Sequence, residues 1–201
     1  MITLIDYGLG NIKAFSNIYN RLGIPCKNAT NYSHLDDATH LILPGVGAFD
    51  YAMDKLNLSG MREKLDELVL EKKIPIIGIC VGMQIMANGS EEGNLEGLGW
   101  YDTEVVKFVN SSINLPLPHM GWNSIDILSD NQLFNNLNKA KRFYFLHSYH
   151  FKSSFEYTIA TSSYSNSFTT VTCKENIFGI QCHPEKSHLN GTKLLKNFSE
   201  V

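Results

Sequence analysis

The first half of the chain alternates short apolar runs with amphipathic stretches. Strands are predicted by four short, mostly apolar segments, residues 2–5, 25–29, 41–43 and 76–79. Apolar side chains recur at helical spacing over residues 12–22 and 61–69, and Asn11 and Gly23 are suited to cap the first of these helices. This order predicts a parallel sheet with right-handed crossovers and with helices on both faces.

The second half of the sequence has a different pattern, with little that predicts helix. Residues 88–99 hold four glycines and three glutamates and are predicted to form a loop. Short β-branched and aromatic segments follow, at residues 105–109, 122–128, 143–151, 157–161 and 168–173. They predict strands that extend or flank the sheet, some of them antiparallel, before a closing helix over residues 190–198. The expected fold is an α/β protein with an open, largely parallel central sheet, built as one domain over residues 1–201.

Composition narrows the functional classes. The 201 residues carry a net charge of −3 with a pI near 6.1 and no basic run, which gives no attraction to nucleic acid. The sequence has no secretory signal and no apolar stretch of membrane-spanning length, so a cytoplasmic protein without a membrane partner is expected. The four cysteines are widely spaced, which predicts neither a disulfide scaffold nor a zinc site.

The run I-P-I-I-G-I-C-V-G-M-Q at residues 74–84 predicts a catalytic cysteine. A buried strand ends at Cys80, helix-forming residues begin at Val81, and Gly78 and Gly82 lie two positions to either side. Small residues allow the tight strand-to-helix turn of a nucleophile elbow, in which backbone N–H groups point toward the atom under attack. The alternative is an ordinary buried cysteine that ends a core strand.

Two glycine-rich loops follow predicted strands. Residues 44–47, P-G-V-G, could turn free N–H groups toward a developing negative charge and so form an oxyanion hole; a plain tight turn is the alternative. Residues 6–11, D-Y-G-L-G-N, match neither a dinucleotide fingerprint nor a Walker loop, and they are interpreted as a structural turn.

Near the C-terminus, I-F-G-I-Q-C-H-P-E-K-S predicts a base and its orienting group. His183 follows an apolar strand, and Glu185 lies two residues further on, so that in extended backbone both side chains would project to the same side. Cys80, His183 and Glu185 would then form a thiol version of the nucleophile, base and acid arrangement. Cys182 would point the other way and pack in the core.

These motifs carry a resemblance to a known family. G-I-C-V-G-M-Q, P-G-V-G and H-P-E-K-S resemble the class I, triad-type glutamine amidotransferases. The motifs D-Y-G-L-G-N, P-H-M-G-W-N and Y-F-L-H-S-Y are similar to those of the glutaminase subunits of imidazole glycerol-phosphate synthase, and the similarity runs nearly end to end. Two departures are visible: Cys182 stands where the family usually has a bulky aromatic residue, and His188 where glutamine is common.

The resemblance implies hydrolysis of L-glutamine to glutamate and ammonia, without a cofactor or metal. Cys80 is expected to attack the carboxamide, and His183, held by Glu185, to transfer protons. Residues expected to hold the oxyanion or the substrate are Gly45, Val46, Gly47, Val81, Gln84, Glu92, Ser148 and Tyr149.

The resemblance also implies a partner. Ammonia is lost as ammonium in water, so it is expected to pass directly to a second polypeptide, a cyclase subunit with a (β/α)8 barrel, in a heterodimer. That pair would make imidazole glycerol phosphate and an aminoimidazole carboxamide ribotide in histidine biosynthesis. Trp122, Asn123, Tyr144 and Lys186 are the expected interface residues; core packing is the alternative for the two aromatic ones.

Three alternatives remain open from the sequence. The same glutaminase chemistry could serve an enzyme that amidates a surface sugar, since these motifs concern the ammonia step and not the acceptor. The second alternative is a cysteine peptidase or stress-type hydrolase, which could be built on a similar sheet. A subunit that only binds is the third, although no member of the expected triad is missing.

Overall fold

The computed structural model describes residues 1–201 except 110–114, 139–140 and 153–155. Its largest sheet has the strand order β2-β1-β3-β4-β13-β12-β11-β8. The strands are β1 (Ile2–Ile5), β2 (Cys26–Ala29), β3 (His40–Gly45), β4 (Ile76–Cys80), β13 (Ile177–Ile180), β12 (Asn166–Lys174), β11 (Thr158–Tyr164) and β8 (Asp126–Ile127). The first five in the sheet order are parallel and the remaining pairs antiparallel, as the sequence predicts.

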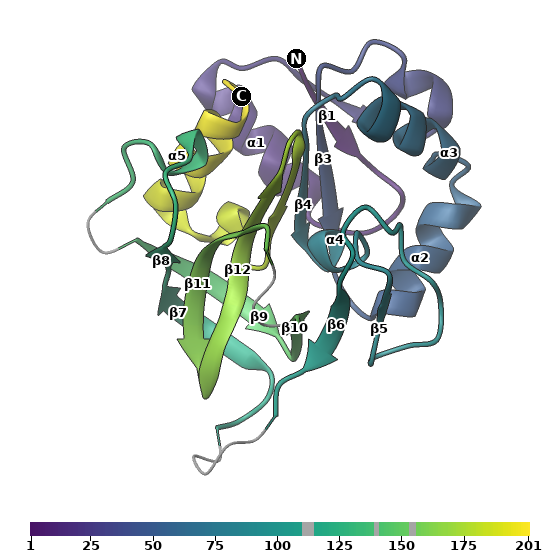
Figure 1. Ribbon diagram of the computed structural model, residues 1–201. Coiled ribbons are helices and arrows are strands. Elements are labelled where there is room, and N and C mark those ends of the chain that lie inside the picture. The colour runs from purple at the N-terminus through teal and green to yellow at the C-terminus, as the bar shows by residue number, and fades with distance from the viewer. Residues whose placement is uncertain (110–114, 139–140, 153–155) are drawn as a thin grey trace.

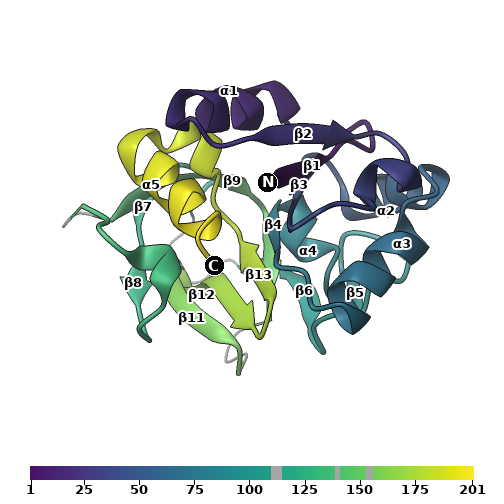
Figure 2. The same cartoon turned by 90° about the horizontal axis from the view of Figure 1, so that it is seen from above.

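Helices cover the two faces of this sheet (Figure 2). On one side lie α1 (Ile12–Leu22) and α5 (His188–Phe198), and on the other α2 (Phe49–Leu58) and α3 (Arg62–Asp66). The short α4 (Val81–Gln84) follows β4 directly. Of the parallel strands, β1, β3, β4 and β13 bury almost every side chain because both of their faces are covered, whereas β2, at the edge of the sheet, buries only Ala29.

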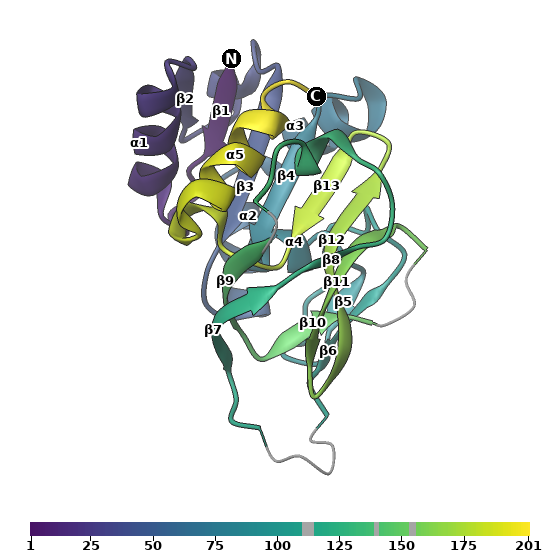
Figure 3. The same cartoon turned by 90° about the vertical axis from the view of Figure 1, so that its left-hand side faces the viewer.

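Two small sheets lie beyond the carboxyl ends of the parallel strands (Figures 1 and 3). One has the order β10-β6-β5, formed by β10 (Tyr149–Phe151), β6 (Glu104–Lys107) and β5 (Gly89–Ser90). The other pairs β7 (His119–Ser124) with β9 (Arg142–His147). The chain therefore closes over the edge of the sheet at which ligands of open α/β folds bind.

Several local predictions need correction. The side chain of Asn11 makes no capping hydrogen bond, and its backbone (φ −92°, ψ 64°) lies outside the extended region typical of an N-cap residue. Gly23 does end α1 in the left-handed conformation, at φ 69°. Residues 61–69, predicted as one helix, divide between α3, which ends at Asp66, and a π-helical segment over Glu67–Glu71 that follows it directly. The expected loop at 88–99 contributes the two residues of β5, which pair with β6.

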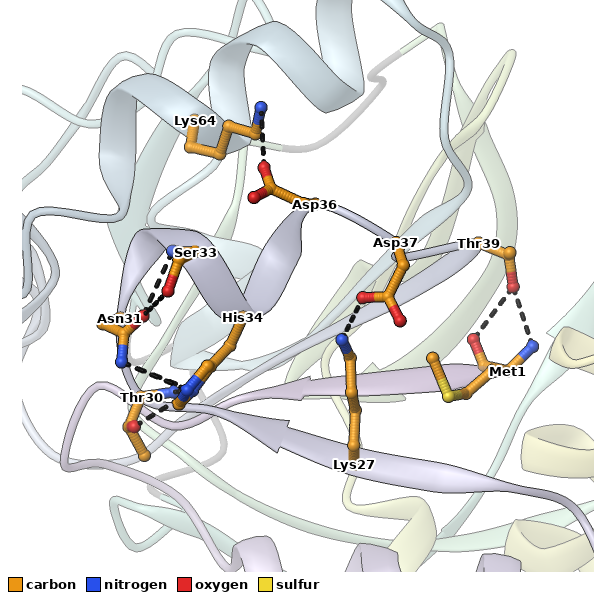
Figure 4. A network of polar contacts seen from close by, with 10 residues as sticks. All are labelled: Met1, Lys27, Thr30, Asn31, Ser33, His34, Asp36, Asp37, Thr39 and Lys64. Carbon is orange, nitrogen blue, oxygen red and sulfur yellow. Dashed lines mark hydrogen bonds and ion pairs between the residues drawn. The ribbon is translucent and has the colours of Figure 1, made fainter.

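A polar network ties the start of the sheet together (Figure 4). The Met1 ammonium donates to Oγ1 of Thr39 at 2.8 Å, which joins the beginnings of β1 and β3. Lys27 on β2 pairs with Asp37, and Lys64 on α3 pairs with Asp36 at 3.2 Å. These exposed pairs contribute little stability each, but they brace the segment that leads from β2 into β3.

Within the described residues, none of the helices combines the length and apolar character needed to cross a bilayer.

Candidate active site

Cys80 occupies a strained turn between β4 and α4. Its backbone has φ 56° and ψ −116°, a region that side-chain-bearing residues rarely adopt and that concentrates at functional sites. The thiol is 3 % exposed, and its Sγ lies 3.8 Å from the carbonyl oxygen of Leu146. The predicted strand, turn and nucleophile elbow are therefore all present.

Glycine is required beside the cysteine because the backbone of the neighbouring strand comes close. A Cβ atom at Gly82 would lie 1.9 Å from the carbonyl oxygen of Leu43 on β3, and one at Gly78 would lie 2.6 Å from the carbonyl oxygen of Gly82. No side chain fits at either distance. The elbow is thus packed directly against the strand that leads into the P-G-V-G loop.

His183 and Glu185 meet, although not in the predicted way. Nδ1 of His183 lies 2.9 Å from Oε1 of Glu185, and both side chains are at most 5 % exposed. However, β13 ends at Ile180, and Pro184 begins a 3-10 turn over Pro184–Lys186. The carboxylate therefore reaches back from a tight turn and not along an extended strand, because proline favours the first position of a helical turn.

Contacts with Cys80 and Glu185 favour the charged form of His183. Burial alone would lower the pKa of this imidazole, but hydrogen bonding and charge interaction with Cys80, then with Glu185, raise the pKa to about 10. The second carboxylate oxygen, Oε2 of Glu185, is buried without a hydrogen-bond partner among the described residues. A buried carboxylate with one oxygen left without a hydrogen bond gains from a positively charged neighbour, here the imidazolium of His183.

This coupling leads to a titration experiment. In Cys80→Ala, the pKa of His183 is expected to fall below about 10, since both contributions of the thiol group are removed. In the unaltered protein, a raised folded-state pKa contributes stability that is fully present below the ordinary histidine pKa of about 6.5 and is lost as pH rises through about 10. NMR titration of the His183 ring measures the pKa directly, and an unchanged value in the variant would contradict the contact.

One pocket brings together most of the predicted site residues. It is lined by Val46, Gly47, Cys80, Val81, Gln84, Glu92, Leu146, His147, Ser148, Tyr149, His183 and Lys186. Glu185 lies behind His183. Gly45 is outside this lining, because it is still part of β3, in register with Cys80, where a Cβ atom would lie 2.3 Å from the backbone nitrogen of Gly82.

The side of the pocket near α4 is held by amide groups. Nε2 of Gln84 donates to the carbonyl oxygen of Tyr149 at 2.9 Å and to Oε1 of Gln181 at 3.0 Å. Both of its N–H groups are therefore engaged, which leaves Oε1 of Gln84 to accept a hydrogen bond from a ligand. Glu92 also lines the pocket, and its Oε2 accepts the backbone N–H of Phe49, the first residue of α2, at 2.9 Å.

Comparison with known proteins settles the family. The family model described as "Glutamine amidotransferase class-I" matches residues 3–201. The chain is 50% identical to "Imidazole glycerol phosphate synthase subunit HisH" of Bdellovibrio bacteriovorus over 204 residues, with 100% of both chains covered.

This chain is a class-I glutamine amidotransferase.

Other relatives agree on the family. "Imidazole glycerol phosphate synthase subunit HisH 2" of Pseudomonas aeruginosa is 41% identical, again with 100% of both chains covered. Among solved structures, a "glutamine amidotransferase" superposes with a TM-score of 0.75 at 17% identity, covering 99% of this chain and 97% of the other. PurLQS from Thermotoga maritima gives 0.72 at 16%, with the same coverage. At such identities the structures support the fold alone, and the fold predicted from the sequence is confirmed.

Three residues at this pocket escaped sequence reasoning, namely Gln181, His147 and Leu146, the last of which lines the pocket next to His147. Gln181 is fully buried, and its Nε2 lies 3.8 Å from Sγ of Cys80. Its position two residues before His183 was a usable signal, because alternate residues of an extended segment share a side. His147 also lines the pocket. It carried no such signal, since its place depends on the pairing of β7 with β9.

The residues expected at a partner interface lie on and near the small β7–β9 sheet. Trp122 is opposite Tyr144 in the register, and Nζ of Lys186 lies 5.7 Å from the centre of the Tyr144 ring. The indole of Trp122, 39% exposed, stacks on His188 at 5.1 Å. Asn123 differs, because it points to the other face of β7, where its Nδ2 donates to the carbonyl oxygen of Ser163 at 2.9 Å.

Proposed function

We propose that this chain is the glutaminase subunit of imidazole glycerol-phosphate synthase, with Cys80, His183 and Glu185 as its catalytic triad. The observation that carries the proposal is the convergence of the elbow cysteine and the His183–Glu185 pair at one pocket. The cavity has a volume of about 150 Å³, below the roughly 300–1,000 Å³ typical of sites for drug-sized ligands. A single amino acid suits it better than a polypeptide.

The chemistry begins at sulfur. The Cys80 thiolate adds to the carboxamide carbon of glutamine, and the oxygen of that group becomes an oxyanion. The imidazolium of His183, stabilised by Glu185, then gives its proton to the departing nitrogen, so that ammonia leaves and a glutamyl thioester remains. Water, deprotonated by His183, attacks the thioester and releases glutamate, which restores the thiol.

Backbone donors near the elbow would stabilise the oxyanion. The Val81 N–H belongs to the first turn of α4, next to the attacking sulfur, and Val46 and Gly47 line the pocket from the loop after β3. Removal of one such donor costs roughly 3 kcal/mol in comparable sites. For the rest of the substrate, Gln84 offers a carbonyl oxygen, Glu92 a carboxylate suited to the amino group, and Ser148 and Tyr149 their backbone.

Ammonia must then reach an acceptor without meeting bulk water. The relatives are named as subunits of a synthase. We assign the second subunit as a (β/α)8-barrel cyclase that docks on the face formed by Trp122, Tyr144 and Lys186, beside the pocket. Aromatic side chains such as those of Trp122 and Tyr144 are frequent anchors of protein interfaces, and the exposed Lys186 lies beside them.

The test is product analysis with the assembled pair. The chain mixed with the cyclase subunit of the same organism, glutamine and the cyclase's nucleotide precursor is expected to form glutamate, imidazole glycerol phosphate and the carboxamide ribotide in equal amounts. Glutamate formed without the imidazole product would point to another acceptor, such as a surface sugar. Cleavage of peptide substrates without glutamine turnover would instead favour the peptidase alternative.

A further inference from the structure

A pair of buried histidines lies outside the proposed triad. The antiparallel pairing of β7 with β9 places His119 directly opposite His147, and Nδ1 of His119 lies 3.1 Å from Nε2 of His147. Their exposed fractions are 4% and 6%. His147 lines the substrate pocket, whereas His119 lies one strand further from it.

Aromatic rings fix the planes of both imidazoles. His119 is stacked between Phe145, at 4.9 Å, and Tyr164, at 4.1 Å, with an interplanar angle of 24° in each case. His147 packs against Phe108 and Phe168, at 5.2 and 5.1 Å. The faces of His119 are therefore covered by stacked rings, and His147 is enclosed by tilted ones, so the nitrogen atoms of both imidazoles interact with the groups at the ring edges.

The groups at those edges decide where the protons lie. Nδ1 of His147 is 2.8 Å from the carbonyl oxygen of Tyr149, which can only accept, so Nδ1 must carry hydrogen. Burial lowers the pKa of His147 well below its usual value and that of His119 to about 4, so both rings are neutral and hold one proton each. Nε2 of His147 must then accept from Nδ1 of His119.

The same argument applies to the groups at both ends of this series of hydrogen bonds. Nε2 of His119 is left as an acceptor, and Nδ2 of Asn123 lies 3.3 Å from it. At the other end, the Tyr149 carbonyl oxygen also accepts from Nε2 of Gln84 at 2.9 Å. This oxygen is consequently held from two directions, by the histidine chain and by the amide on α4.

We propose that His119 and His147 are positioning residues that hold the glutamine-binding backbone at Ser148 and Tyr149 through a one-directional chain of donors, from Asn123 to His119, to His147 and to the Tyr149 carbonyl. The inference rests on the proposed function, because it concerns how the glutamine pocket is held. It also links β7, whose outer face carries Trp122, to the wall of the pocket.

Histidine tautomers give the first test, on the unaltered protein. Nitrogen-15 NMR of the ring nitrogens is expected to show both His119 and His147 as neutral Nδ1–H tautomers, with signals assigned through their contacts to Phe145 and Phe168. An Nε2–H tautomer or a charged ring at either position would overturn the proposal. This measurement depends neither on activity nor on the folding of a variant.

Glutamine kinetics of the assembled pair give the second test. An asparagine amide can reach the position of Nδ1, whereas a glutamine amide reaches that of Nε2. His147→Gln is therefore expected to raise the KM for glutamine about tenfold with kcat little changed, and His147→Asn to restore most of the loss. Equal effects of the two variants, or a loss of stability without a change in KM, would overturn the proposal.

Asn123, the first donor of this hydrogen-bond chain, offers a matched comparison. Asn123→Asp places an acceptor against the acceptor Nε2 of His119, so its KM is expected to exceed that of Asn123→Ala, which only removes the donor. Both variants also lose the hydrogen bond from Nδ2 to the carbonyl oxygen of Ser163, so that loss is common to the two. His40→Gln is the control, and it should leave the KM for glutamine unchanged. This histidine also contacts a carbonyl oxygen, that of Val201 at 3.2 Å, but it lies at the start of β3, and the pocket lies beyond the end of that strand. If Asn123→Ala proved worse than Asn123→Asp, the direction assigned to the chain would be wrong.

The two proposals fail separately. A protein that does not hydrolyse glutamine but shows both Nδ1–H tautomers would contradict the proposed function alone. An active glutaminase with an Nε2–H tautomer at His119 or His147 would contradict only the positioning role.

Discussion

Replacement of Cys80 by alanine is expected to abolish glutamine-dependent synthesis and to leave ammonia-dependent synthesis by the assembled enzyme intact. In the proposed mechanism the sulfur forms the covalent bond on which both halves of the hydrolysis depend, and loss of a catalytic nucleophile lowers kcat by about 10⁶ in a well-studied triad hydrolase. External ammonia does not need the thioester. The measurement is product formation with glutamine and, separately, with an ammonium salt near pH 8.5.

Cys26→Ala serves as the control, because this thiol is only half-buried on β2, where it contacts the backbone oxygen of Ser16. It should leave both activities unchanged. Full glutamine-dependent activity in Cys80→Ala would remove the basis of the proposed mechanism, and loss of both activities would mean that the variant no longer assembles with its partner.

Glu185→Gln is expected to have the second largest effect. Glutamine keeps the size of the side chain but carries no charge, so it neither favours the imidazolium of His183 nor fixes which ring nitrogen is protonated. The corresponding change in a serine-based triad lowers kcat by roughly 10⁴. The pKa of His183 should also fall, because Glu185 is one of the two groups that raise it.

Steady-state kinetics with glutamine and an NMR titration of His183 check this prediction together. Glu175→Gln is a suitable comparison, since Glu175 is exposed and pairs only with Lys73, at 2.9 Å, among its ion pairs in the described part of the chain. Retention of more than a tenth of the activity in Glu185→Gln would show that the carboxylate does not orient the base.

The elements that position the nucleophile could be read from local sequence. Residues 76–79 form a continuous apolar run that contains Gly78 and is followed by Gly82, and a run too short for a typical helix favours a strand covered on both faces. The two small sheets could not be predicted in the same way. Segments 122–128 and 143–151 each divide between two sheets, and the division depends on pairings between residues far apart in the chain.

The site shows the same contrast. The contact between His183 and Glu185 was predicted correctly from their spacing, but the turn that makes it was not. An extended backbone was expected there, although proline favours the first position of a helical turn. The histidine pair was missed for a different reason. His119 and His147 are 28 residues apart, and only the β7–β9 register brings them together.

The close approach of Leu43 to Gly82 bears on any attempt to redesign this protein for another amide. Saturation libraries at position 82 should return glycine alone, since even a methyl group would collide with the main chain of β3. New selectivity has to come from the rim, where Glu92 and Ser148 border the pocket and are only partly buried. Variation is thus best confined to the walls that surround the nucleophile and kept away from the turn that carries it.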